Sequence, residues 1–400
     1  MRVTAGEATT AATAHDMQGA LTARDSPALT ASEVHALADA YPTLERPLRL
    51  LWLSPRPFSA AALVRTARGT VFIKRHDARV RDVASLREEH RFMEHLRARG
   101  ISVPSVVRDR QEATAVALEG WIYEVHETAE GVDAYREAHS WEPVRSHGQA
   151  RALGRALAQL HRAAEGFTAP ARRARPLLAS WDIVGDTQLA AALARYVAQR
   201  PAVAEFLAAT NGRERVLEAV EPLHELLRPL LPALDPLWVH NDWHASNLFW
   251  SDLGPNATVC AVIDFGLCNL GVAVADLATA LERNTIAWLE LEKKPQQAVG
   301  TIGHASLAQA LLQGYCAVRA LSAQEREALL LLLPLAHVEY ALSEVEYFHG
   351  IVGNDTNARL AYPKFLLGHI QWFGGRNGRQ YVRSLRSWLR SVSAAESDST

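Results

Sequence analysis

Short runs in which apolar and polar residues alternate occupy the first third of the chain and predict β-strands. The turn residues Arg68-Gly69 and Glu119-Gly120 each separate two of these runs, which is the pattern of antiparallel hairpins. The runs that we assign to strands are 48–53, 61–67, 70–76, 114–118 and 121–127.

Two segments beside these runs have the spacing of helices. Thr30 and Glu33 have the capping-box spacing that opens a short helix over 31–41. Apolar residues of 83–100 fall largely on one helical face, and Gly100 ends that segment. The order helix, strands, helix, strands predicts a small, mostly antiparallel sheet with one helix packed against it.

After about residue 126 the apolar residues recur at helical spacing, interrupted by one hairpin, 247–251 with 259–265. We therefore expect an α+β fold with a β-rich N-lobe over 29–126, a helical C-lobe over 127–390 and a cleft between them. The segments that we assign to C-lobe helices are 148–164, 216–231, 275–292, 304–321 and 323–348.

The two ends of the chain have a different composition. Residues 1–28 and 391–400 are small and polar, so we expect disordered tails, and the first of them has no apolar segment of a signal peptide. The longest apolar run, 329–342, is interrupted by Pro334 and His337, which argues against a membrane helix.

Charge and cysteine content narrow the function classes. The net charge of −2 gives no reason to expect nucleic acid or a membrane as partner. The three cysteines include no C-x-x-C pair, which argues against a disulfide framework and suits the cytoplasm. Oligomeric state cannot be read from these features.

The stretch WVHNDWHASNLFW, residues 238–250, holds the densest group of chemically active side chains. His240, Asp242 and His244 alternate, as they would in a zinc cage. However, zinc histidines of the H-E-x-x-H type lie on a helix, and these residues disfavour one and have no evident third ligand. The alternative is a catalytic loop, H-x-D-x-x-x-x-N, in which Asp242 is a base and Asn247 holds Mg²⁺.

A second carboxylate and a cation complete that alternative. Asp264 ends the apolar run 259–263 and begins Asp-Phe-Gly, and the hairpin would return it beside Asn247 as a second Mg²⁺ ligand. Lys74 ends an alternating strand and would hold nucleotide phosphates. Glu88 or Glu89, on the following helix, could hold Lys74 by an ion pair.

The motifs HNDWHASNLFW, VIDFG and ADLA resemble the aminoglycoside phosphotransferase and choline kinase-like superfamily, which shares the protein-kinase fold, over roughly 30–390. The family's usual loop has glycine where this chain has Asn241, a residue that tolerates positive φ. A match of LREEHRFMEHLRARGISVP to the family's lysine-pairing helix favours Glu89 over Glu88.

The resemblance implies roles for the matched residues. Asp242 would be the catalytic base, and Asn247 and Asp264 would bind Mg²⁺. Lys74, held by Glu89, would bind the phosphates of ATP. His240 and Asp276 would be structural supports, although Asp276 could also be a simple charge at a helix N-terminus. His244 would either orient Asp242 or contact the substrate.

No glycine-rich phosphate loop is present, since the segment WLSPRPFSAAALV contains no glycine. The resembled family often has a serine-rich loop there, which makes Ser54 and Ser59, within 54–62, the candidates for phosphate binding. Adenine would be held by backbone groups of the hinge from Tyr123 through Val125 to Glu127.

The acceptor site is the least defined. Glu339, Tyr340 and Glu346 lie within a few helical turns and would suit a cationic amine, although the two glutamates could equally form a solvated helical face. Asp182 is a weaker candidate. The segment after Asp264 is too short for a full activation loop, which favours a small acceptor.

Together these features predict an ATP- and Mg²⁺-dependent kinase that phosphorylates a hydroxyl of a small molecule, such as an amino alcohol, aminoglycoside or hydroxy amino acid. The alternatives are a nucleotide-binding pseudokinase and a protein Ser/Thr kinase of the stress-response type. Intact Lys74, Asp242, Asn247 and Asp264 argue against the pseudokinase.

Overall fold

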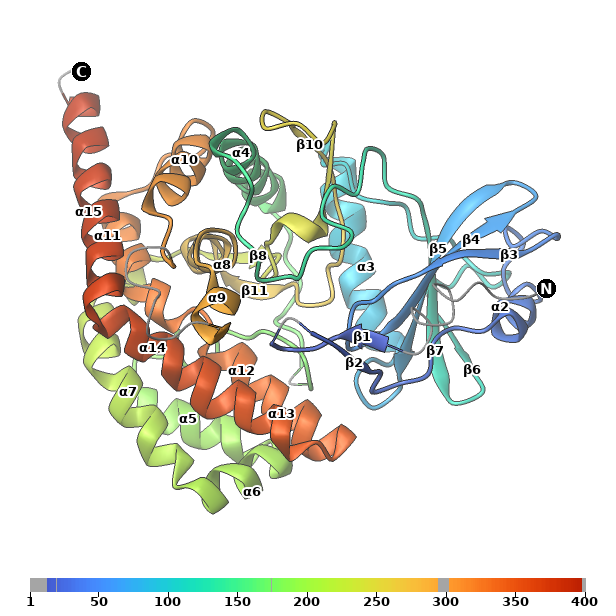
Figure 1. Ribbon diagram of the computed structural model, residues 1–400, viewed down its shortest axis with the longest axis horizontal. Coiled ribbons are helices and arrows are strands. Elements are labelled where there is room, and N and C mark those ends of the chain that lie inside the picture. Colours follow the sequence, from blue (N-terminus) through green and yellow to red (C-terminus); the bar gives the residue numbers. More distant parts are fainter. Residues whose placement is uncertain (1–12, 19, 174, 294–301, 398–400) are drawn as a thin grey trace.

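The computed structural model describes residues 13–18, 20–173, 175–293 and 302–397. A small antiparallel sheet with two helices forms one lobe, and a larger helical lobe packs beside it, as Figure 1 shows. This two-lobe α+β architecture confirms the fold expected from the sequence.

The N-lobe sheet has five strands in the order β3-β4-β5-β7-β6, and all neighbours are antiparallel. Because side chains alternate across a strand, one face of the sheet packs on α2 (Ala31–Leu37) and the other faces α3 (Val83–Ala98) and the C-lobe. The strands are β3 (Arg49–Leu53), β4 (Ala60–Thr66), β5 (Gly69–Asp77), β6 (Val116–Leu118) and β7 (Trp121–Glu127).

The C-lobe is built around helices that pack at close range. Gly154 in α4 (His147–Ala164) and Gly314 in α10 (Ala305–Cys316) allow this, because a Cβ on either glycine would lie 2.0 Å from a carbonyl oxygen of the other helix. The other helices are α5 (Leu189–Ala198), α6 (Pro201–Thr210), α7 (Gly212–Leu227), α8 (Ala273–Thr285), α9 (Trp288–Lys293), α11 (Ala323–Leu332), α12 (Val338–Val345), α13 (Asp355–Arg359), α14 (Leu367–Gly374) and α15 (Arg376–Ser397), with η1 (Leu231–Ala233), η2 (Ala245–Asn247), η3 (Leu333–Leu335), η4 (Glu346–Val352) and η5 (Leu360–Leu366) between them.

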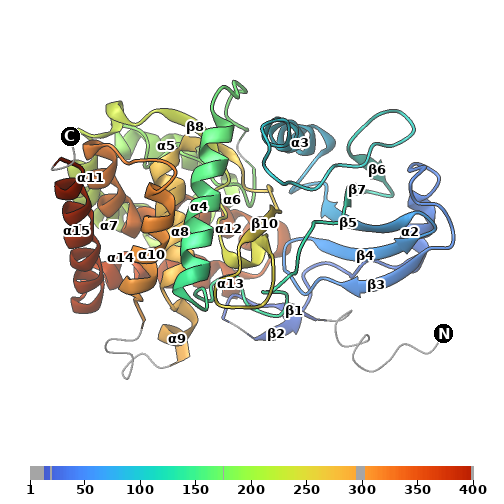
Figure 2. The ribbon, with the colours of Figure 1, turned by 90° about the horizontal axis from the view of Figure 1, so that it is seen from above.

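Two short antiparallel pairs pack on helices of the C-lobe. Strand β8 (Pro236–Val239) pairs with β11 (Asn269–Val272), and β9 (Leu248–Trp250) pairs with β10 (Val259–Val262). The second pair is the hairpin predicted from the sequence. In Figure 2, β8 and β10 both lie beside α4, and β10 is on the side of the C-lobe that faces the sheet.

The two predicted tails are partly wrong. Residues 13–23 form a hairpin of β1 (Thr13–His15) and β2 (Leu21–Ala23), in which Ala14 and His15 are buried. The sequence pattern missed it because its burial comes from packing on the two lobes. Residues 391–397 continue α15, whose apolar face buries Leu385 and Leu389 on the C-lobe. Residues 1–12 and 398–400 lie outside the described residues.

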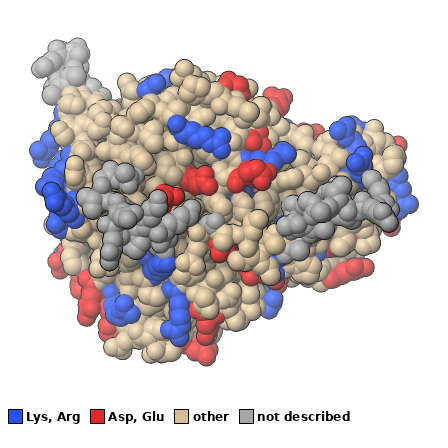
Figure 3. Space-filling view, in the orientation of Figure 1, with Lys and Arg blue, Asp and Glu red and all other residues tan. Residues whose placement is uncertain are grey.

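One helical stretch, Ala323–Val352, is long and apolar enough by composition to cross a membrane. Its most apolar window is 83% buried inside the protein, as expected for a core helix. The basic side chains gather elsewhere: Figure 3 shows them along the edge occupied by α15. The exposed arginines of that helix are Arg376, Arg379, Arg383, Arg386 and Arg390.

Candidate active site

The loop between β8 and β9 is held in shape by a buried carboxylate. Asp276, on the first turn of α8, accepts hydrogen bonds from the backbone N–H groups of His240 (3.0 Å) and Asn241 (2.9 Å). His161 of α4 contacts the same carboxylate at 3.0 Å. Asn241 has a φ of 63°, so it adopts the left-handed conformation for which glycine is usual. Hydrogen bonds from the loop backbone to Asp276 therefore hold the loop in this conformation.

Asp242 lies at the centre of this loop. His244 Nε2 is 3.3 Å from its Oδ2, and Asn247 Nδ2 donates to its Oδ2 (3.0 Å) and backbone oxygen (2.9 Å). Burial alone would raise the pKa of Asp242, but His244, with Arg283 and His240, lowers it well below the usual range. The carboxylate is therefore ionised, and His244 contacts Asp242 through one nitrogen and Ser246 through the other.

The zinc cage is excluded by how His240 uses its ring. Its Nε2 contacts the carbonyl oxygen of Ile263 at 3.1 Å, and its Nδ1 accepts from the backbone N–H of Asp242. The ring packs 4.8 Å from that of Phe265. Both nitrogens are thus occupied by backbone groups, which makes His240 a link between the loop and the Asp-Phe-Gly segment.

Asp264 reaches the same place from β10. It has a φ of 59°, and Lys74 Nζ of β5 lies 3.0 Å from its Oδ1. Burial opposes the charge on Lys74, but Asp264, Glu124 and Glu89 raise its pKa above the ordinary value. Burial likewise would raise the pKa of Asp264, and Lys74 outweighs that effect. A lysine of the N-lobe and a carboxylate of the C-lobe therefore form one ion pair.

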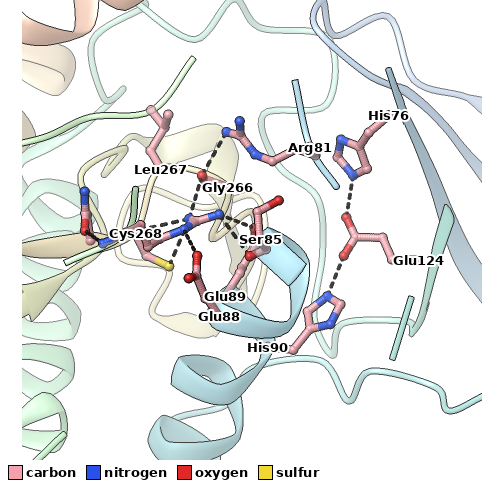
Figure 4. A network of polar contacts seen from close by, with 12 residues as sticks. His76, Arg81, Ser85, Glu88, Glu89, His90, Glu124, Gly266, Leu267 and Cys268 are labelled. Carbon is pink, nitrogen blue, oxygen red and sulfur yellow. Dashed lines mark hydrogen bonds and ion pairs between the residues drawn. The ribbon is translucent and has the colours of Figure 1, made fainter. Parts of the chain in front are cut away.

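The predicted ion pair between Lys74 and Glu89 is not formed among the described residues. Glu89 is buried on α3, and its nearest cation is Arg172 at 3.7 Å, which also lies 3.7 Å from Glu88. Arg172 also donates to the backbone oxygens of Ser85 (3.2 Å) and Cys268 (3.0 Å), two residues that Figure 4 labels beside Glu88 and Glu89. Sequence reasoning missed this arginine because it lies in an irregular segment without periodicity.

Glu124 takes part of the role expected of Glu89. It lies opposite Lys74 across β5 and β7 and contributes to the raised lysine pKa. Three histidines contact its carboxylate: His76 at 2.8 Å, His90 at 2.7 Å and His126 at 2.9 Å. Figure 4 shows His76 and His90 on either side of it. This buried group fixes the sheet to α3 behind the lysine.

The loop before β4 lines the pockets around these residues. Ser59 lines two of them, and the Ser54 hydroxyl accepts from the backbone N–H of Arg56 (3.2 Å). Arg56 points inward, donating to Tyr135 O (3.2 Å) and Ser140 Oγ (3.3 Å). Burial lowers the pKa of Arg56, which Asp133, Asp264 and Asp242 counteract. A cation that sequence reasoning missed thus faces the two aspartates.

Two pockets meet at these residues. Pocket A, between the lobes, is lined by Lys74, Glu89, Met93 and Phe249 among others. Pocket B lies on the C-lobe side and includes Asp242 and His244. The lining residues common to both pockets are Arg56, Ser59, Asn247 and Asp264.

The hinge is displaced from the predicted position. Tyr123 and Val125 point into the core beside α2, and the Tyr123 hydroxyl donates to Glu33 at 2.9 Å. Their strand is paired with β5, and Val125 O also accepts from Val107. The residues of this stretch that do line pocket A are Glu124, His126, Glu127, Thr128 and Ala129.

The acceptor residues require a correction. Glu339 is buried away from pocket B, where it accepts from the Ser180 hydroxyl and from the backbone N–H groups of Asp182, Ile183 and Val184. Glu346 contacts Arg200 at 3.1 Å. Neither glutamate, nor Asp182, lines either pocket A or pocket B.

Tyr340 lines pocket B, and Glu344, one helical turn later, lines it too. Burial raises the pKa of Glu344 to about 8. Arg283 of α8 also lines this wall. Asp16, Arg24 and Asp25 of the N-terminal segment line the same pocket, so the segment expected to be a disordered tail helps to enclose it.

Comparison with known proteins agrees with this geometry. The model of the phosphotransferase enzyme family matches residues 57–330. A homoserine kinase from Rhodopseudomonas palustris is 30% identical over 284 residues, which is 71% of this chain and 74% of that protein.

Solved structures are similar in fold. A microcompartment-associated aminopropanol kinase has a TM-score of 0.55 at 17% identity and covers 87% of this chain and 99% of its own. An aminoglycoside phosphotransferase from Alicyclobacillus acidocaldarius has a TM-score of 0.52 at 17% identity and covers 92% of this chain and 98% of its own. The resemblance drawn from the motifs is confirmed: the chain belongs to the phosphotransferase enzyme family and is a kinase.

Proposed function

We propose that this kinase transfers the γ-phosphoryl group of ATP to a hydroxyl of a small molecule, with Asp242 as the base. The observation that carries the proposal is that pockets A and B share Asn247 and Asp264, with Lys74 on one side and Asp242 on the other. A nucleotide in pocket A and an acceptor in pocket B would meet there.

Pocket A suits a nucleotide. Its walls are apolar at Leu63, Phe72, Met93 and Ile263, which fits a flat base, and backbone groups after Glu127 lie at one end. The other end has the cations Lys74 and Arg56, which suit phosphates. An amicoumacin kinase and an aminoglycoside phosphotransferase of this fold have been solved in complex with AMP-PNP, which supports ATP as donor.

The donor set also fits Mg²⁺. Asn247 turns its Nδ2 toward Asp242, and no described residue donates to its Oδ1; together with Asp264 this offers two oxygen ligands. When bound, Mg²⁺ neutralises charge on the phosphates. Asn247 and Asp264 would hold the ion, and Lys74 and Arg56 would hold phosphate oxygens.

Phosphoryl transfer then follows from the positions of the side chains. The acceptor oxygen forms a bond to the γ-phosphorus as the bond to the β-phosphate oxygen breaks, and the hydroxyl proton passes to Asp242 Oδ. His244 and Asn247 orient the carboxylate for this step.

Pocket B favours a small acceptor that carries both charges. Its carboxylate Asp25 suits an ammonium group, whereas Arg24 and Arg283 suit a carboxylate. A hydroxy amino acid has both groups, and a relative named homoserine kinase is consistent with that class. We therefore place hydroxy amino acids first and amino alcohols second.

The test is Mg²⁺-dependent ADP release measured with hydroxy amino acids, amino alcohols, aminoglycosides and a generic protein substrate. Acceptor-stimulated turnover in the native protein, lost in Asp242→Asn, supports the proposal. Tight ATP binding without stimulation by any acceptor favours the pseudokinase instead. Stimulation by the protein substrate alone favours a protein kinase.

A further inference from the structure

A second group of ionisable side chains lies buried beside pocket B, apart from the phosphoryl-transfer residues. Glu282 of α8, His337 before α12 and His369 of α14 are between 2% and 4% exposed. One ligand atom from each lies within 4.8 Å of the others, and Glu282 Oε1 is 3.0 Å from His369 Nδ1. Three helices distant in sequence thus converge on one point.

These atoms lie close to one another, yet no described residue gives any of them a hydrogen bond of acceptable geometry. Glu282 Oε1, His337 Nε2 and His369 Nδ1 are each buried without a hydrogen-bond partner among the described residues. The same holds for Glu344 Oε2, which lies 3.6 Å from His337 Nε2. Buried polar atoms without hydrogen bonds cost free energy, so three of them within 4.8 Å, with a fourth 3.6 Å from His337, indicate a shared partner.

The chemistry of the group selects the kind of partner. Two imidazoles and two carboxylates, enclosed by aromatic rings, are a typical donor set for Zn²⁺. Trp288 stacks on His369 at 3.7 Å, and Trp141 meets His337 edge-on at 5.3 Å. These rings orient the imidazoles.

Charge also favours a cation there. Arg283 lies 3.3 Å from Glu282 Oε2 and balances one carboxylate. Glu344 is the second buried carboxylate, and a divalent cation would compensate for its negative charge. No other lysine or arginine contacts either carboxylate within the described ranges.

The other buried histidine cluster differs in this respect. His90, Glu124 and His126 also bring three ligand atoms within 4.8 Å. There, however, both histidines contact Glu124 through Nε2, at 2.7 and 2.9 Å, so the carboxylate is already satisfied. That cluster serves as an internal control.

We propose that Glu282, His337 and His369, with Glu344 as fourth ligand, bind one Zn²⁺ ion that ties α8, α12 and α14 together. Glu344 and Arg283 both line pocket B. The ion would therefore hold the wall of the acceptor pocket, independently of the Mg²⁺ that acts on the nucleotide.

The test uses the full chain, freed of metal with a chelator and titrated with Co²⁺ in the presence of excess Mg²⁺. We expect one equivalent to bind, with the visible absorption of four-coordinate Co²⁺, and Zn²⁺ to displace it. His337→Gln and His369→Gln should lose this binding, whereas His126→Gln should keep it.

Folding is controlled by His369→Cys, which retains a ligand and should add a thiolate-to-cobalt charge-transfer band absent from the native protein. That band would place residue 369 on the ion even if the glutamine variants fold poorly. The proposal is overturned if the native chain binds no stoichiometric Co²⁺, or if His126→Gln abolishes binding that His369→Gln retains.

Discussion

Lys74 Nζ lies 3.0 Å from Asp264 Oδ1, so the ion pair that joins the lobes runs to the aspartate of Asp-Phe-Gly and not to α3. The lysine therefore touches the carboxylate that we assign to Mg²⁺. Nucleotide binding must redistribute these contacts, with the phosphates and the ion taking over the charges that now face each other.

Replacement of this lysine should therefore abolish turnover. Lys74→Met removes the cation that would hold the phosphates, and we expect kcat/KM for ATP to fall by ~100-fold or more. Arg65→Met, an exposed cation on the neighbouring strand, is the matched control and should leave steady-state kinetics unchanged. Equal kinetics in Lys74→Met and the native protein would remove Lys74 from the site.

Asp276 should act by positioning the loop. Asp276→Asn replaces one carboxylate oxygen with a donor facing the backbone N–H groups of His240 and Asn241. A shifted loop misplaces Asp242, so kcat should fall by about 100-fold while KM for ATP changes little. Asp182→Asn, an exposed aspartate, is the control. A fall in ATP affinity with kcat preserved would contradict this role.

Glu339 should be important for stability and not for the acceptor. Glu339→Gln leaves buried backbone N–H groups of residues 182–184 with fewer acceptors, which should lower the free energy of unfolding by about 1–3 kcal/mol. Urea unfolding measures this loss, with the exposed Glu205→Gln as control. If Glu339→Gln raised the KM for the acceptor and left the free energy of unfolding unchanged, Glu339 would belong to the acceptor site after all.

The N-terminal hairpin should loosen in mild acid. Burial, with His139 and Arg56, lowers the pKa of His15 to about 4, whereas the free side chain titrates near 6.5. The opened hairpin therefore binds more protons between these values, and its closed form loses stability as pH falls from 6.5 to 4. Hydrogen-exchange protection of residues 13–23 should drop between pH 7.5 and 5.

His15→Phe supplies the control for that measurement. Phenylalanine keeps a ring against His139, with which His15 stacks at 4.2 Å, but cannot be protonated. The pH dependence should therefore shrink in this variant. The same loss of protection in both proteins would place the titrating group elsewhere.

The sequence alone predicted the parts of the site whose spacing the chemistry constrains. Asp242 and Asn247 share one loop, and Asp264 follows through a hairpin, so their meeting could be anticipated. The acceptor-binding residues could not be anticipated in the same way. No motif in the sequence indicates which face of their helix points into pocket B. Tyr340 and Glu344 share a face, and Glu339, one residue earlier, lies about 100° away from Tyr340.

Long-range packing explains the other differences. Arg172 competes for Glu89 from an irregular segment without periodicity. The hairpin at 13–23 has a polar sequence, and only its contact with both lobes buries His15. Such contacts depend on tertiary structure that local patterns do not encode.

The most direct test of the central claim is ³¹P NMR of the native protein with Mg²⁺, ATP and a hydroxy amino acid such as homoserine, beside Asp242→Asn. We predict a phosphomonoester resonance that grows with ADP in the native sample and is absent or at least ~100-fold slower in the variant. Equal ester formation in both samples would contradict Asp242 as the base of a small-molecule kinase.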